Sequence, residues 1–106
     1  MKVATVGIDL AKNVFQIHGV NEIGKPVIKK QLRRSQVAEY FVNLPPSVIG
    51  VEACGSAHHW ARKLLALGLD LNVKIIAAHF VAPYRLQGKG GKNDANDAAA
   101  ICEAAS

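Results

Sequence analysis

Val3-Ala4-Thr5-Val6-Gly7-Ile8-Asp9-Leu10-Ala11-Lys12 lies almost at the start of the chain and is apolar apart from one hydroxyl, one carboxylate and the closing lysine. It predicts a central, buried β-strand, because side chains alternate between the two faces of a strand and here both faces are apolar. Asp9 is the exception, since an ionised carboxylate beside a core is costly unless water, a hydrogen bond or a cation offsets it. Taken alone, Asp9 is interpreted as a cap for the following turn.

The composition indicates one soluble globular domain. The chain has 106 residues, 50% of them hydrophobic and 20% charged, which is enough for a core. No apolar run approaches the roughly 18 residues that span a bilayer, and the N-terminus does not resemble a signal peptide. Cys54 and Cys102 are too few for a disulfide framework and lack metal-site spacing, which predicts free thiols, with Cys54 as a packing residue. We therefore expect a cytoplasmic protein with no membrane partner.

The basic residues are bunched in the sequence. Thirteen Lys and Arg against eight Asp and Glu give a formal net charge of +5. Such bunching suits a phosphate backbone, although a solvated surface that binds nothing can have the same charge. The candidate nucleic-acid-binding residues are Lys29, Lys30, Arg33, Arg34, Lys89 and Lys92.

Residues 13–20 and 26–32 predict two further strands, joined by a hairpin turn over 21–25, so that the first three strands form a meander. Lys29, Lys30 and the leading Pro26 suit a sheet edge. Ser35 is a plausible N-cap for a helix that Pro45-Pro46 stops.

A fourth strand is expected over residues 47–53, where Gly7-Ile8-Asp9 returns as Gly50-Val51-Glu52. If the two strands are parallel neighbours, Asp9 and Glu52 emerge side by side at their carboxyl ends, the edge where open α/β sheets bind ligands. Ser56 then caps a helix, residues 72–77 predict a fifth strand, and a short helical piece follows around 79–86. His58 and His59 are adjacent in a helix, which argues against a shared metal.

A Gly-rich basic loop over 87–93 precedes a helix that begins with Asp94-Ala95-Asn96-Asp97. Asp94 and Asp97 share a face, beside a predicted buried stripe of Ala98, Ile101, Cys102 and Ala105. The two acids can be explained as a cap and a favourable first-turn charge. Beside Asp9 and Glu52, however, they supply a third and fourth carboxylate, and Gly7 and Gly50 indicate a close approach to the sheet.

Four clustered acids need cations. Carboxylates are the ligands that Mg²⁺ or Mn²⁺ prefers, and two such ions stabilise the attacking and leaving oxygens of a phosphoryl displacement. Without metal the acids would repel one another, so Asp97→Asn is expected to leave the metal-free domain as stable or more stable.

These residues resemble a known family. Gly7-Ile8-Asp9-Leu10-Ala11-Lys12, Val51-Glu52-Ala53-Cys54-Gly55 and Lys92-Asn93-Asp94-Ala95-Asn96-Asp97-Ala98 are similar to motifs of the DEDD transposases of the Piv and IS-one-ten type. The resemblance implies an α/β, ribonuclease H-like fold of the RuvC type: a five-stranded mixed sheet with a three-strand antiparallel meander and helices on both faces. It places the catalytic and metal-binding tetrad on Asp9, Glu52, Asp94 and Asp97.

The resemblance further implies a transposase that moves an insertion sequence, with Mg²⁺ or Mn²⁺, two ions, at the tetrad. DNA is the implied substrate, a guide RNA the implied partner, and a homo-oligomer the implied full-length state. Residues 1–106 would be the N-terminal catalytic domain, and the family's second, serine-bearing domain would be absent, so full strand exchange is not expected. Two alternatives stay open: a non-catalytic nucleic-acid-binding module, and an actin-like or sugar-kinase ATPase, although Leu10-Ala11-Lys12 after Asp9 lacks that fold's small phosphate-binding residues.

Overall fold

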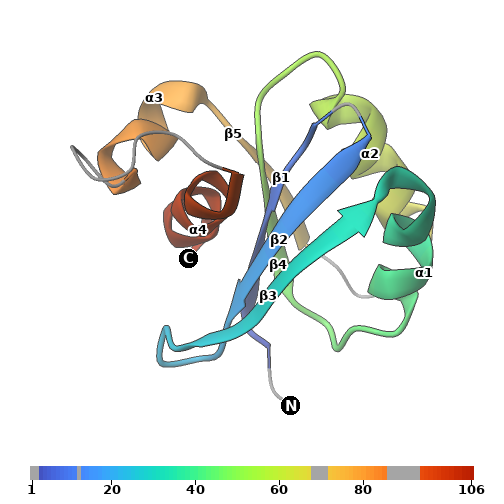
Figure 1. The fold of residues 1–106 in the computed structure, drawn as a ribbon, viewed down its shortest axis with the longest axis horizontal. Coiled ribbons are helices and arrows are strands. Elements are labelled where there is room, and N and C mark those ends of the chain that lie inside the picture. Colours follow the sequence, from blue (N-terminus) through green and yellow to red (C-terminus); the bar gives the residue numbers. More distant parts are fainter. Residues whose placement is uncertain (1–2, 12, 68–71, 86–93) are drawn as a thin grey trace.

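The chain folds around a five-stranded mixed sheet with the strand order β3-β2-β1-β4-β5 (Figure 1). The computed structural model describes residues 3–11, 13–67, 72–85 and 94–106, without the side chains of residues 94–96. In chain order the elements are β1 (Thr5–Asp9), β2 (Val14–Val20), β3 (Pro26–Arg33), the 3₁₀ turn η1 (Arg34–Gln36), α1 (Val37–Val42), β4 (Val48–Glu52), α2 (Ala57–Leu65), β5 (Asn72–Ile76), α3 (Ala78–Val81), the 3₁₀ turn η2 (Ala82–Tyr84) and α4 (Asp94–Ala105). The predicted α/β class, mixed sheet and central first strand are confirmed.

The first three strands form the expected antiparallel meander, with β3 at one edge of the sheet. The hairpin between β2 and β3 is closed by Asn21, whose Oδ1 accepts the backbone N–H of Ile23 at 3.1 Å and of Lys25 at 2.9 Å. Gly24 has a φ of +82°, a conformation that glycine adopts without steric cost. The turn chemistry therefore sets the register of the meander.

The other half of the sheet is parallel. β1 pairs with β4 so that Gly7 lies opposite Gly50 and Ile8 opposite Val51, and β4 pairs in parallel with β5. The predicted parallel pairing of the two Gly-x-acid segments is thus confirmed. Since both strands run in one direction and in register, Asp9 and Glu52 end them at the same edge of the sheet.

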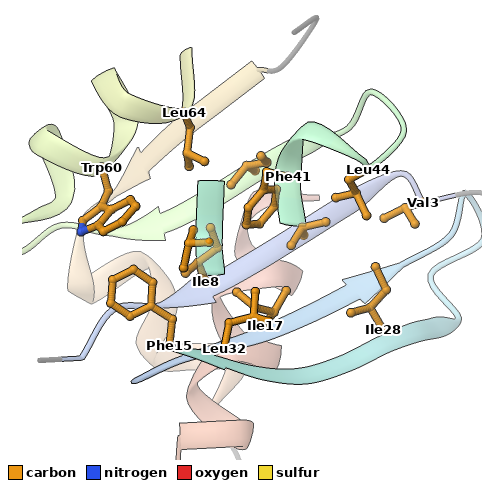
Figure 2. Packing of buried hydrophobic residues seen from close by; sticks show 13 residues of the cluster. Val3, Ile8, Phe15, Ile17, Ile28, Leu32, Phe41, Leu44, Trp60 and Leu64 are labelled. Atoms are coloured by element: carbon orange, nitrogen blue, oxygen red, sulfur yellow. The ribbon is translucent and has the colours of Figure 1, made fainter. Parts of the chain in front are cut away.

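One face of the sheet carries the large hydrophobic side chains, under α1 and α2 (Figure 1). Figure 2 shows Ile8 and Ile17 of the sheet meeting Phe41 of α1 and Trp60 of α2. Trp60 is 1% exposed and packs edge-to-face on Phe15, with ring centroids 4.9 Å apart. Buried aromatic pairs in this geometry contribute about 0.5–1.5 kcal/mol beyond their buried area.

The opposite face is covered by α4, with α3 beside it (Figure 1). The predicted stripe of Ala98, Ile101, Cys102 and Ala105 is buried, each residue at 2% exposure or less. A Cβ added to Gly7 would overlap the carbonyl oxygen of Ala98 and the backbone nitrogen of Cys102, and one added to Gly50 would lie 2.6 Å from the Cβ of Ala105. The prediction that these glycines mark a close approach to the sheet is confirmed, and the approaching element is α4.

Three local predictions were wrong or only partly right. Ser35 lies inside η1 and is no N-cap; the Gln36 side chain instead accepts the Arg33 backbone N–H at 2.9 Å, because a 3₁₀ turn precedes the helix. Ser56 holds the N-cap position of α2 without a side-chain cap bond. Cys54 is exposed, since it follows the end of β4, whereas Cys102 belongs to α4 and its thiol is buried against β1. Both thiols are free, as predicted.

Within the described ranges, no helix is long and apolar enough to cross a bilayer.

Candidate functional site

The candidate site lies at the carboxyl edge of β1 and β4. Asp9 and Glu52 are the last residues of these two neighbouring strands, and both are partly buried. They alternate with Gly7 and Gly50 along their strands, so they are on the α4 side of the sheet. Adjacent strands are about 4.8 Å apart, so the register alone brings these two carboxylates to one place.

Arg85, just after η2, joins two of the predicted acids across the fold. Its Nη2 donates to both oxygens of Glu52, at 3.0 Å to Oε1 and 2.9 Å to Oε2. Its Nε donates to Oδ1 of Asp97 at 2.9 Å. The structure therefore brings together Glu52 from β4 and Asp97 from α4 on one guanidinium.

The three side chains are partly shielded from solvent: that of Arg85 is 24% exposed, Glu52 23% and Asp97 18%. Charge-assisted hydrogen bonds of this kind are shorter and stronger than neutral ones. Hydrogen bonds to Glu52 and then to Asp97 raise the pKa of the Arg85 guanidinium above its ordinary value. The site thus holds a permanent cation against two carboxylates.

Arg85 changes one expectation. Asp97→Asn was expected to leave the metal-free domain as stable or more stable, because four acids would repel one another. The guanidinium between Glu52 and Asp97 replaces that repulsion with attraction for this pair. Neutralising Asp97 is now expected to remove a favourable hydrogen bond.

The structure describes the side chains of Asp9, Glu52 and Asp97 of the predicted tetrad. The side chain of Asp94 lies outside the described residues, although the backbone places Asp94 at the first position of α4, three residues before Asp97. Among the residues whose positions are described, no group of three or more His, Cys, Asp or Glu side chains is arranged to hold a metal ion. His58 and His59 are both exposed on α2.

A row of polar residues crosses the sheet on the side of Asp9. Asp9 pairs with Gln16 of β2, and Gln16 pairs with Gln31 of β3. The amide of Gln16 donates through Nε2 to Oε1 of Gln31 at 3.0 Å. Because these residues occupy one register position on adjacent strands, a line of hydrogen-bonding groups runs from the edge of the sheet to the acids. Sequence reasoning did not identify this row.

The candidate nucleic-acid-binding residues separate onto two faces. Lys29 and Arg33 flank Gln31 on β3 and share its side of the sheet, and all three are exposed. Lys30 is on the other side, where its Nζ lies 5.4 Å from the centre of the Tyr40 ring. Lys89 and Lys92 lie outside the described residues.

Arg34 lies on the α1 and α2 side of the sheet, where its Cζ is 5.5 Å from the centre of the Trp60 ring. Lys63 of α2 stands 4.9 Å from the same ring. Both cations therefore lie near the same indole, and Lys63 extends the predicted basic surface onto α2.

A hollow lies beside α4. It has a volume of about 330 Å³ and is lined in part by His18, Tyr84, Cys102 and Glu103. Burial, and next the charge of Lys29, lowers the pKa of His18. Burial raises the pKa of the Cys102 thiol to about 11, so at neutral pH this cysteine is protonated and weakly nucleophilic.

Several curated transposases are similar to the chain over nearly its whole length. The "Probable family 20 transposase" of Pseudomonas aeruginosa is 53% identical over 106 residues, which is 100% of this chain and 30% of that protein. The "Transposase for insertion sequence element IS1111A" of Coxiella burnetii is 40% identical over 101 residues, 95% of this chain and 26% of that protein. The "Transposase for insertion sequence element IS1328" of Yersinia enterocolitica is 40% identical over 104 residues, 98% of this chain and 30% of that protein.

The chain therefore spans less than a third of the length of these relatives. No family model matches it.

Proposed function

From its similarity to proteins named transposases, we propose that this chain is the part of a transposase that supplies the acids for DNA strand cleavage and transfer. The observation that carries the proposal is the meeting of Glu52 and Asp97 on one guanidinium, beside the strand that ends in Asp9. Acids from a strand and a distant helix converge on one guanidinium, and clusters of partly buried charged groups of this kind occur preferentially at functional sites.

The topology supports a ribonuclease H-like fold of the RuvC type. An antiparallel meander over β1 to β3, beside the parallel strands β4 and β5, matches the five-stranded mixed sheet with a three-strand meander that the motif resemblance implied. In this fold proposal, β1 supplies the first acid, β4 the second and α4 the remaining two.

The acids suit a divalent cation. Glu52 and Asp97 already hold a guanidinium between them, which shows that this place favours positive charge, and carboxylate oxygens are hard ligands. In the proposal Asp9, Glu52, Asp94 and Asp97 hold Mg²⁺ or Mn²⁺, two ions. Such ions polarise the phosphate and stabilise the attacking and leaving oxygens. The chain's own residues hold the ions and orient the nucleic acid.

The polar row and its flanking cations supply a path for the DNA. Lys29 and Arg33 can neutralise phosphates at the edge strand, and Gln16 and Gln31 can exchange hydrogen bonds with the backbone or with bases. This path leads along one register position to Asp9. A guide RNA and a homo-oligomer belong to the proposal for the longer protein.

The experiment measures Mn²⁺ binding by calorimetry and by anomalous scattering from soaked crystals. The parent chain is expected to bind Mn²⁺ at the β1–β4 edge, and Asp9→Asn to weaken that binding by at least about tenfold, since one charged ligand is lost. Glu39→Gln, which removes an exposed carboxylate from α1, is the matched control and should change nothing. If the parent chain binds no Mn²⁺ at this edge, the proposal of a metal-dependent function is refuted.

One observation favours a second candidate. Because Arg85 already satisfies Glu52 and Asp97, these acids could serve the fold alone, in a nucleic-acid-binding module without catalysis. Such a module would bind DNA through Lys29 and Arg33 with an affinity that does not respond to Asp9→Asn or to Mn²⁺.

A further inference from the structure

We propose that Arg85 is an exchangeable counter-ion: it holds Glu52 and Asp97 together while no metal is bound, and it leaves them when a divalent cation binds. This inference rests on the proposed metal-dependent function and adds a specific role for a residue outside the predicted tetrad. It places Arg85 in competition with the metal for the same carboxylate oxygens.

The competition follows from which oxygens Arg85 uses. Both oxygens of Glu52 accept from its Nη2, and Oδ1 of Asp97 accepts from its Nε, at 2.9–3.0 Å. A metal ion bound to Glu52 and Asp97 would take electron pairs from these same atoms. The guanidinium and the ion also carry like charge, so both cannot occupy the space between the two carboxylates.

The charge balance favours the exchange. Arg85 brings one positive charge to two carboxylates, whereas a divalent ion brings two. Two carboxylates brought close together without any cation would repel each other, and one would take up a proton. Arg85 therefore keeps the site assembled and charged before metal arrives.

The position of Arg85 allows it to leave. It follows η2 directly, belongs to no helix or strand, and its side chain is 24% exposed. A guanidinium on a long stem can turn toward solvent without disturbing the sheet or α4. Once released at the acid edge, it has the planar, bidentate geometry that matches a phosphate, so the same residue can then contact the nucleic acid that the metal acts on.

A fixed structural role would make the opposite prediction. If Arg85 stays in place and orients the acids for metal, its removal weakens metal binding. If Arg85 must leave, its removal strengthens metal binding, because the ion no longer has to displace a guanidinium that is hydrogen-bonded to both carboxylates. The sign of the change in Mn²⁺ affinity therefore separates the two roles.

The test compares Arg85→Gln, Arg85→Lys and the parent 106-residue chain by Mn²⁺ calorimetry and by melting with and without Mn²⁺. Arg85→Gln is expected to lower the melting temperature of the metal-free chain and to lower the Kd for Mn²⁺ about tenfold. Arg85→Lys keeps the charge but loses the planar fork, so its Kd should fall between the two. Arg62→Gln removes an exposed arginine from α2 and serves as the control for charge alone.

The outcomes separate this inference from the function on which it rests. Tighter Mn²⁺ binding by Arg85→Gln, with Arg62→Gln unchanged, supports the exchange. Equal or weaker binding by both Arg85 variants, with a parent that binds Mn²⁺, overturns the exchange and leaves the metal site standing. No Mn²⁺ binding by the parent or either Arg85 variant overturns the metal site and the exchange together. If Arg85→Gln does not fold, the affinity of Arg85→Lys against the parent decides.

Discussion

Replacing Gly7 with alanine is expected to damage the fold and the acidic site together. The new methyl group would meet backbone atoms of α4: the carbonyl oxygen of Ala98, the nitrogen of Cys102 and, at 2.8 Å, the Cα of Cys102. Backbone atoms cannot rotate away as a flexible side chain does. α4 would have to move by about 1 Å to restore an ordinary contact of about 3.5 Å.

The magnitude follows from two opposing effects. Alanine restricts the unfolded chain and would gain about 0.4–1 kcal/mol if it fitted. Overpacking a well-packed interface costs about 1–3 kcal/mol, and overlap with backbone atoms of α4 puts Gly7→Ala at the upper end. The expected net loss is about 2–2.5 kcal/mol, which is a fall in melting temperature of about 8–20 °C for a domain of this size.

Thermal and urea unfolding of a glycine series measures this loss. Gly55→Ala is the control, because a methyl group there meets nothing within 4 Å and should change stability by less than about 0.5 kcal/mol. Gly19→Ala should fall between the two, since its methyl group would meet Cβ and Cδ1 of Ile28 at 3.1 Å, a milder overlap than the one at Gly7. Equal stability of Gly7→Ala and Gly55→Ala would refute the reasoning that α4 rests directly on the backbone of β1.

Three further predictions concern single groups. Asp97→Asn should lower the melting temperature of the metal-free chain by about 4–8 °C, since it weakens one hydrogen bond from Arg85 worth about 1 kcal/mol; a rise would restore the repulsion argument. Changing Lys29 and Arg33 together to Ala should flatten the plot of log affinity for duplex DNA against log salt by about 1.8 if both contact phosphates, measured by fluorescence anisotropy; an unchanged slope would mean that neither side chain contacts the DNA. Cys54 should react with a thiol reagent at pH 8, while the buried Cys102 stays protected. Folding also raises the pKa of the Cys102 thiol from 9.0 to about 11, so the free energy of unfolding should decline as the pH rises from about 9 to 11. A Cys102→Ala variant that declines equally over this pH range would assign the loss to other groups.

The sheet could be predicted from the sequence because its physics is local and periodic. Alternation over residues 3–10 indicated a strand covered on both faces, and the Asn21 to Lys25 turn carried its own hydrogen-bonding chemistry. The repeat of Gly7-Ile8-Asp9 as Gly50-Val51-Glu52 indicated parallel neighbours and a close approach to the sheet; the register confirms the first and the contacts of α4 the second.

Arg85 could not be predicted in the same way. It follows Pro83 and Tyr84 in a short irregular segment with no periodicity, and its partners are 33 and 12 residues away in sequence. The available signal was indirect: acids expected to converge without metal require a cation, and the nearby basic residues include Arg85 as well as Lys89 and Lys92. Which of them serves depends on the path of the chain after β5, and no local pattern encodes that path.

Trp60, the single tryptophan of the chain, gives the molecule a built-in optical probe. Its indole is buried between α2 and the sheet, on the face opposite α4, and packs against Phe15 (Figure 2). Lys63 and Arg34 lie near the same ring. Its emission should shift to longer wavelength only when that core opens to water. Local loosening of α4 by a variant would leave the spectrum native, whereas global unfolding would change it. Comparing tryptophan emission with helix content measured by circular dichroism therefore reveals whether the two faces of the sheet come apart in one step or separately.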